Sequence, residues 1–261
     1  MNAPGYYFMK MHQERSYVLA LENTSEIDGM YIDLNKEGYS FRTYNNLLLL
    51  GGISHRTGEN EEGGSYDKLR KVAKNLYPKA KEKYYWSAQD CMTIDGIPYI
   101  GRYSSETSNI YVATGFNKWG MTSSMVSAMI ISDMILEKEN DFSEIFSPRR
   151  FDLSLSINNI ANDLIETAKN FIAQKVSIPS SEIEHIKNGH GGIIEYNGEK
   201  VGVYKNKEGK EFFVSTKCTH LGCQLSWNAD ELTWDCPCHG SRFDYKGRLI
   251  GSPATKDLIE D

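Results

Sequence analysis

Two short segments near the end of the sequence combine cysteine and histidine at close spacing. The first contains Cys218 and His220, and the second contains Cys236 and His239. Thiolate and imidazole groups are side-chain donors that suit iron and zinc. Because each segment offers one sulfur and one nitrogen, the pattern predicts a metal centre that two loops hold jointly.

The residues around these donors resemble the two ligand loops of Rieske [2Fe–2S] proteins. The loops read Cys-Thr-His-Leu-Gly-Cys at 218–223 and Cys-Pro-Cys-His-Gly-Ser at 236–241. The resemblance is to the disulfide-containing branch of the family, as in the iron–sulfur subunit of cytochrome bc complexes. It extends over residues 177–261 and implies an all-β Rieske domain there.

The resemblance gives a role to every cysteine and histidine of the two loops. Two thiolates are expected on one iron and two imidazoles on the other: Cys218 and Cys236, then His220 and His239. The remaining cysteines, Cys223 and Cys238, lie one in each loop and are expected to form a disulfide between the loops. A structural zinc site is the alternative for the four donors. A framework of disulfides alone would leave both histidines unexplained.

Residues near the second loop are expected to tune the reduction potential of the cluster. In the family, a serine at the position of Ser241 donates a hydrogen bond to a bridging sulfide. High-potential members carry a tyrosine at the position of Phe243, and its hydroxyl donates to a ligand thiolate. Hydrogen bonds to the sulfurs raise the potential, so we expect a lower potential here. Residues 251–254 resemble the proline loop that covers the cluster from a third side.

Composition limits the class of protein. The 261 residues are 40% hydrophobic and 25% charged, which is typical of a soluble protein large enough for two modest domains. The net charge of −6 does not favour a nucleic-acid partner. The longest apolar stretch, 125–136, is too short to span a membrane, and the start lacks a basic and then apolar leader. These features predict a cytoplasmic protein without a membrane partner.

The first part of the chain reads as antiparallel β-structure followed by two helices. Short aromatic or branched runs separated by turn residues predict strands at 17–21, 29–34, 39–43 and 47–52, and later at 83–89 and 109–114. A helix is expected over 65–76, with Ser65 as its N-cap and an apolar face. A second helix is expected after Thr122, where apolar residues recur at spacings of three and four.

A glycine-spaced turn joins the strand at 109–114 to this second helix. Such a turn directs backbone N–H groups and the positive end of the helix dipole toward whatever lies in front of it. Four segments, at 7–11, 50–52, 93–98 and 114–122, resemble the C-terminal half of the D-amino-acid-oxidase and glycine-oxidase family of FAD-dependent oxidoreductases. In that family the last segment closes over the flavin ring. The residues implied to contact FAD are Gly115, Phe116, Trp119, Gly120, Met121 and Thr122.

The sequence departs from this family at two points. The Gly-x-Gly-x-x-Gly unit that binds the ADP half of FAD is absent, so FAD binding is expected only with a nucleotide-binding half from elsewhere. Thr122 stands where some relatives place a basic residue for the substrate carboxylate. The chain is therefore interpreted as an oxidoreductase component that acts on a C–N bond and needs that missing half.

Together these features predict an α+β chain with three parts. Residues 1–150 form a partial flavoprotein substrate domain with an antiparallel sheet, 151–176 a helical linker, and 177–261 the Rieske domain. The expected function is electron transfer through a Rieske cluster within an FAD-dependent amine or amino-acid oxidoreductase, with a redox partner protein. The alternative is a non-catalytic electron carrier whose flavoprotein-like part is a flavin-free docking domain. A Rieske oxygenase is disfavoured, because the other histidines have no facial-triad spacing.

Overall fold

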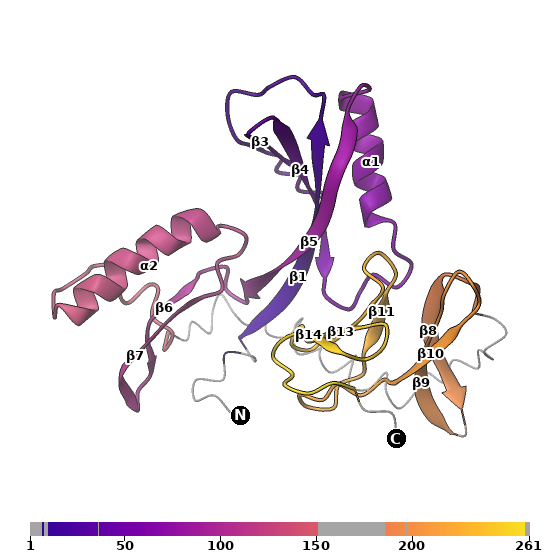
Figure 1. Cartoon of the computed structure of the whole chain (residues 1–261). Helices are drawn as coiled ribbons and strands as arrows, with labels where there is room; N and C mark the ends of the chain where they lie inside the picture. The colour runs from indigo at the N-terminus through magenta and orange to yellow at the C-terminus, as the bar shows by residue number, and fades with distance from the viewer. Residues whose placement is uncertain (1–6, 8–9, 36, 151–185, 197, 259–261) are drawn as a thin grey trace. The chain divides into compact units, whose positions relative to one another are not determined.

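The computed structural model describes residues 7, 10–35, 37–150, 186–196 and 198–258 (Figure 1). The expected linker at 151–176 lies outside these residues. The chain clusters into two compact units. The first consists of Met1–Gln13 with Asp90–Lys169, and the second of Glu14–Gln89 with Asn170–Asp261. The second unit thus joins most of the expected flavoprotein sheet with the expected Rieske domain.

The first sheet has five strands in the order β2-β3-β4-β1-β5. Their bounds are β1 Met11–Glu22, β2 Tyr31–Ile32, β3 Ser40–Tyr44, β4 Leu47–Arg56 and β5 Lys81–Thr93. The central pair, β1 and β4, is antiparallel, with Leu19 opposite Leu50 and Leu21 opposite Leu48. These alternate residues are buried on one face, as a strand period of two requires. The strand expected at 29–34 is only the two residues of β2.

Helix α1, Ser65–Leu76, covers the buried face of this sheet. Tyr66, Leu69 and Ala73 are spaced at three and four and pack into the same core as the leucines of β1 and β4. The prediction that Ser65 caps the helix is wrong. Gly64, with φ of 89°, is the N-cap residue and no side chain of the cap position bonds the helix. Glycine adopts this left-handed conformation without strain.

The first unit contains a hairpin and the second helix. Strands β6, Tyr99–Ser104, and β7, Thr107–Thr114, pair antiparallel, and α2, Gly120–Ile135, follows them. The turn before β6 is held by Arg150, whose guanidinium donates to both oxygens of Asp95 at 2.9 and 3.0 Å. The same guanidinium lies 4.3 Å from the ring centre of Tyr99. This bidentate pair fixes the segment on which the flavoprotein resemblance partly rests.

The C-terminal part of the second unit contains two small antiparallel sheets. The first has the order β10-β9-β8 and the second β11-β12-β13-β14. The bounds are β8 His190–Tyr196, β9 Glu199–Lys205, β10 Glu211–Ser215, β11 Ser226–Asn228, β12 Thr233–Asp235, β13 Arg242–Asp244 and β14 Leu249–Gly251. The all-β character of this part, and the α+β character of the chain, agree with the prediction.

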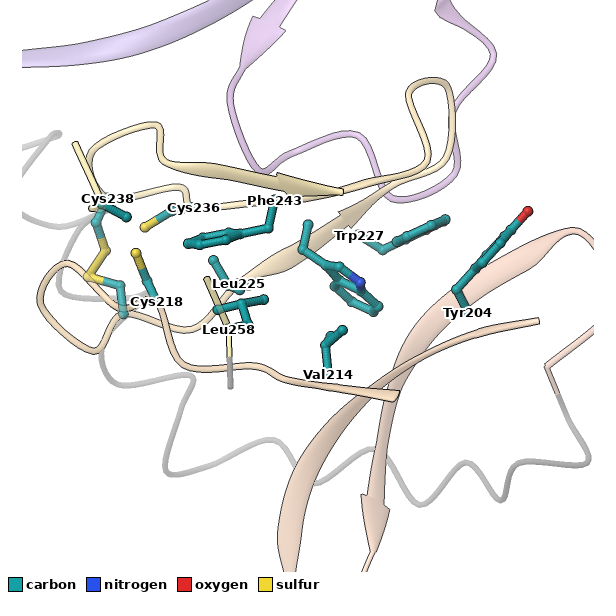
Figure 2. Packing of buried hydrophobic residues seen from close by; sticks show 12 residues of the cluster. Tyr204, Val214, Cys218, Leu225, Trp227, Cys236, Cys238, Phe243 and Leu258 are labelled. Carbon is teal, nitrogen blue, oxygen red and sulfur yellow. A yellow bond between two sulfur atoms is a disulfide. The ribbon is translucent and has the colours of Figure 1, made fainter. Parts of the chain in front are cut away.

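Aromatic residues fill the space between these two sheets. Trp227 lies opposite Trp234, and Trp234 lies opposite Phe243, across successive strand pairs. Two glycines permit the close approach of the indoles: a Cβ at Gly191 would lie 2.6 Å from Trp227, and one at Gly202 would lie 2.9 Å from Trp234. Figure 2 shows three of the cysteines at one end of this core and Tyr204 at the other.

Candidate metal centre

Both candidate ligand loops connect short strands of the C-terminal part. The loop at 218–223 lies between β10 and β11, and the loop at 236–241 connects β12 to β13. The labelled cysteines of both loops lie at the same end of the buried aromatic core. Figure 2 shows Cys218 and Cys236 facing each other there.

The two loops share one backbone hydrogen-bond pattern. In the first, the N–H of Gly222 donates to Cys218 O at 2.8 Å, and the N–H of Cys218 donates to Cys223 O at 2.8 Å. In the second, Gly240 and Cys236 make the equivalent bonds at 2.9 and 2.8 Å. Gly222 and Gly240 have φ of 76° and 77°, so each loop needs glycine at its fifth position.

The thiols of Cys218 and Cys236 interact, and each changes the pKa of the other. The thiol of Cys236 lowers the pKa of Cys218 to about 6, and the backbone N–H groups of His220 and Leu221 contribute. The thiol of Cys218 and burial raise the pKa of Cys236. Backbone N–H groups of His239 and Cys238 also point at the Cys236 sulfur. Such donors stabilise negative charge on sulfur, which is what a thiolate ligand requires.

The imidazoles of His220 and His239 lie next to each other. Their ring centres are 5.0 Å apart with the planes at 89°. Burial lowers the pKa of His239 to about 4, with a contribution from His220, and burial also lowers the pKa of His220. Both rings are therefore neutral at pH 7, the form that binds metal. The Nδ1 atom of each ring is buried.

A disulfide joins Cys223 to Cys238. It lies directly beside the thiol of Cys236, because the sulfurs of Cys223, Cys236 and Cys238 are within 4.8 Å of one another. The bond ties one candidate ligand loop to the other, in agreement with the expected disulfide. A link of this kind limits how far two metal-binding loops can separate when the metal leaves.

Ser241 ends the second loop, Phe243 lies two residues further on, and both are fully buried. The Ser241 hydroxyl accepts a hydrogen bond from the N–H of Ala254 at 3.0 Å and contributes to the lowered pKa of Cys218. Ala254 belongs to the segment at 251–254. This segment therefore contacts Ser241, which is expected to donate a hydrogen bond to the cluster. In Figure 2 the ring of Phe243 points toward the side of the core that carries the cysteines.

This donor set fits a Rieske cluster. Each loop contributes one of two thiols that interact and one of two neutral imidazoles that lie next to each other, and a disulfide joins the two loops. A mixed pair of thiolates and imidazoles is the ligand set of the [2Fe–2S] centre. The Ser241 hydroxyl, which contributes to the lowered pKa of Cys218, is a donor of the kind that tunes such centres.

The residues expected at the flavin lie around the start of α2. Gly115 has φ of 71°, and a Cβ there would lie 2.2 Å from Thr93, so only glycine fits. Phe116 is half-buried. The remaining four expected residues are exposed among the residues that the structure describes: Trp119, Gly120, Met121 and Thr122.

Asn117 is a residue of this turn that the sequence reasoning did not identify. It has φ of 49°, its Oδ1 accepts from the N–H of Thr93 at 2.8 Å, and its Nδ2 donates to Gly115 O at 2.9 Å. The side chain thus joins the end of β5 to the turn before α2. The available signal was the residue type, since asparagine tolerates the left-handed region better than most residues.

Both the N-terminal sheet and the candidate metal centre lie in regions that match known protein families. The chain belongs to the FAD dependent oxidoreductase family, whose model matches residues 1–134, and it contains a Rieske [2Fe-2S] domain, whose model matches residues 176–260. The chain is 41% identical over 260 residues to YhfW of Bacillus subtilis (strain 168), whose name describes it as a Rieske 2Fe-2S iron-sulfur protein. That match covers 97% of this chain and 51% of YhfW.

The Rieske domain also resembles iron–sulfur subunits of cytochrome b6-f complexes. It is 44% identical over 95 residues to cytochrome b6-f complex iron-sulfur subunit 1 of Nostoc sp. (strain PCC 7120 / SAG 25.82 / UTEX 2576), covering 35% of this chain and 52% of that protein. Glycine oxidase from Geobacillus kaustophilus is 22% identical, with a TM-score of 0.47 over 55% of this chain and 40% of that one. The chain thus spans about half the length of the curated relatives it matches. None of the described helices is long and apolar enough to cross a membrane.

Proposed function

We propose that the chain is the electron-transfer component of an FAD-dependent oxidoreductase that acts on a C–N bond. The observation that carries this proposal is that two loops joined by a disulfide pair Cys218 with Cys236 and His220 with His239 in a chain of the oxidoreductase family. A bound Rieske cluster supplies a centre that takes up and gives up one electron at a time. The C–N substrate class follows from the resemblance of 93–98 and 114–122 to amino-acid oxidases.

The four donors have distinct roles in this proposal. Cys218 and Cys236 hold one iron, and the backbone N–H groups directed at their sulfurs offset the negative charge. His220 and His239 hold the other iron as neutral ligands. The oxygen of Ser241 accepts a hydrogen bond from the N–H of Ala254, which leaves its hydroxyl proton available as a donor to a sulfur of the cluster.

An uncovered face of α2 supports a partner that carries the nucleotide-binding half. Met121, Met125 and Met129 are spaced by four residues and are 85%, 66% and 62% exposed. The opposite side of the helix buries Ser123 and Ile130. A contiguous apolar helix face usually marks a protein interface. The occupant we propose is the FAD-binding half, because this chain spans 51% of the length of its relative YhfW.

The proposal includes a redox partner that contacts the first ligand loop. Leu221, next to His220, is 49% exposed, and Thr219 and Gly222 are also exposed. An exposed apolar residue beside a metal ligand suits a transient contact with a small electron-transfer interface. The proposed partner is a protein that accepts single electrons.

The test is the metal content and spectrum of the purified full chain. We expect two irons and two acid-labile sulfides per chain, and, after reduction, the electron-resonance signal of mixed histidine and cysteine coordination. His239→Ala should abolish that signal, whereas His190→Ala, an exposed histidine at the start of β8, should leave it unchanged. Zinc as the only stoichiometric metal would overturn the proposal.

A further inference from the structure

Strand β5 contributes a side chain that reaches the second ligand loop. Gln89 donates a hydrogen bond from Nε2 to the carbonyl oxygen of Gly240 at 3.0 Å. Gly240 lies between His239 and Ser241, so this contact is one residue away from a proposed ligand. Gln89 and the loop belong to the same compact unit. A residue of the oxidoreductase sheet therefore binds the metal-binding loop of the Rieske domain directly.

Two other residues of the sheet region set the orientation of Gln89. Its Oε1 accepts hydrogen bonds from Arg15 on β1 at 2.9 Å and from Thr57 at 3.0 Å. Since the amide oxygen is held from two sides, the amide nitrogen is directed toward Gly240. Arg15 and Thr57 are both buried, so water does not compete for these bonds.

Arg15 also faces the strand that leads into the second loop. Its Nε lies 3.9 Å from Oδ2 of Asp235, and neither side chain is more than 2% exposed. Asp235 immediately precedes Cys236 and also accepts a hydrogen bond from Arg242 at 3.1 Å. A buried carboxylate between two guanidinium groups is strongly constrained, because displacement leaves a buried charge uncompensated.

The backbone of the sheet region makes a third contact with the second ligand loop, at Gly58. Gly58 follows β4 and has φ of 88°. A Cβ at Gly58 would lie 2.7 Å from the Cβ of Pro237, which separates Cys236 from Cys238. A side chain at position 58 would therefore push against the loop, and glycine permits the close packing.

A fourth contact joins the Rieske domain to α1. The carboxylate of Asp230 accepts hydrogen bonds from the N–H groups of Gly64 and Ser65 at 3.0 and 2.9 Å, and from Nδ2 of Asn60 at 2.8 Å. A residue of the C-terminal part thus takes over the capping of this helix. An acidic group at a helix N-terminus is favoured by the unpaired N–H groups and by the dipole.

The first ligand loop lacks such a cover in the part of the chain that the structure describes. Thr219, Leu221 and Gly222 are exposed, whereas Pro237 and Gly240 are buried. The two loops share their internal hydrogen bonds, so the difference arises from what packs against each. The second loop packs against the sheet region, and the first loop is exposed.

We infer that Gln89 and Arg15 are positioning residues of the metal centre and that the oxidoreductase sheet forms the outer wall of its second ligand loop. This inference rests on the proposed ligands. The sheet holds the second loop, with Cys236 and His239, in a fixed position. The first loop remains available for contact with an external redox protein.

Hydrogen–deuterium exchange on the full chain tests the inference loop by loop. Gln89→Leu leaves the Gly240 carbonyl buried without its donor, and loss of one such bond corresponds to about tenfold faster exchange. We expect that increase in the peptide covering 236–241 and no change in the peptide covering 218–223. In iron-loaded protein, the same variant should alter the electron-resonance line positions and release iron to a chelator about tenfold faster.

Two further variants separate positioning from general damage. Gln89→Glu keeps an acceptor for Arg15 and Thr57 but has no donor for Gly240, so it should reproduce the loop-specific effect in a folded chain. Lys83→Leu alters an exposed position on the same strand and should change neither loop. Equal acceleration in both loops, or unchanged exchange in 236–241, would overturn the inference.

The outcome does not depend on the identity of the metal. If the wild-type chain binds zinc or no metal, the proposed function fails, but the exchange difference between the two loops still reports whether the sheet holds the second loop. If iron and sulfide are present and the exchange difference is missing, only the positioning role fails. The two results are therefore distinguishable.

Discussion

Phe243→Tyr tests whether the chain lacks a hydrogen bond to its cluster. Phe243 is fully buried on β13, opposite Trp234, and its ring points toward the cysteines in Figure 2. The substitution adds one hydroxyl at the end of the ring nearest the sulfurs. We expect this hydroxyl to donate to Cys218 or Cys236, because a buried hydroxyl without an acceptor is unfavourable.

The size of the effect follows from the difference between two redox states. A hydrogen bond to a charged acceptor stabilises by about 1.5–3 kcal/mol, and only the excess in the reduced state moves the potential. An excess of about 1 kcal/mol corresponds to a rise of about 40 mV for one electron, since about 59 mV is equivalent to a tenfold change in equilibrium. Withdrawal of electron density from the sulfur should also lower the pKa values of the imidazole ligands in the oxidised protein.

Protein-film voltammetry between pH 5 and 10 would measure both effects. The midpoint potential should rise. The pH above which the midpoint potential decreases should be lower in the variant than in the wild-type chain. Phe243→Leu is the control, because it alters packing without adding a donor and should not raise the potential. A folded Phe243→Tyr chain with an unchanged midpoint potential would refute the hydrogen-bond reasoning.

Four other predictions follow from the site and its supports. His220→Cys should keep a cluster but lower its reduction potential, because a thiolate replaces a neutral ligand; voltammetry would measure this shift in midpoint potential. The isolated chain should bind FAD poorly, and addition of the nucleotide-binding half should restore yellow colour; stoichiometric FAD on this chain alone would contradict this. Asn117→Ala removes the bonds to Thr93 and should lower the free energy of unfolding in urea by about 1–2 kcal/mol. Tyr66→Phe removes the 2.6 Å bond to Glu231 and should cost about 1 kcal/mol, measured in the same way.

Local features of this chain were predictable because they depend on neighbouring residues. The bounds expected for the helix at 65–76 match α1, since its apolar residues recur with the helical period. Most strands of the first sheet were also found by their branched and aromatic residues. The run at 29–34 failed because Met30, Tyr31, Ile32 and Leu34 are exposed, so no core contact extends the two-residue strand.

The N-terminal cap of α1 shows where local reasoning stops. Ser65 is a favoured capping residue by type, but the helix is capped by Asp230, which is 165 residues away from it in the chain. Only tertiary packing brings that carboxylate to the N–H groups. Helix α2 gives a second example, because periodicity predicts the helix but does not tell that Met121, Met125 and Met129 are exposed while Ile130 is buried.

The sequence by itself determined the two families and indicated the candidate donors of the metal centre, because residue type, loop spacing and glycine position are properties of short segments. Tertiary structure decided what surrounds those donors. Gln89 and Arg15 reach the second loop from strands far away in the chain, and the first loop remains exposed. The physical reason is that burial and buried hydrogen bonds depend on which surfaces meet, and no spacing within a segment specifies that meeting.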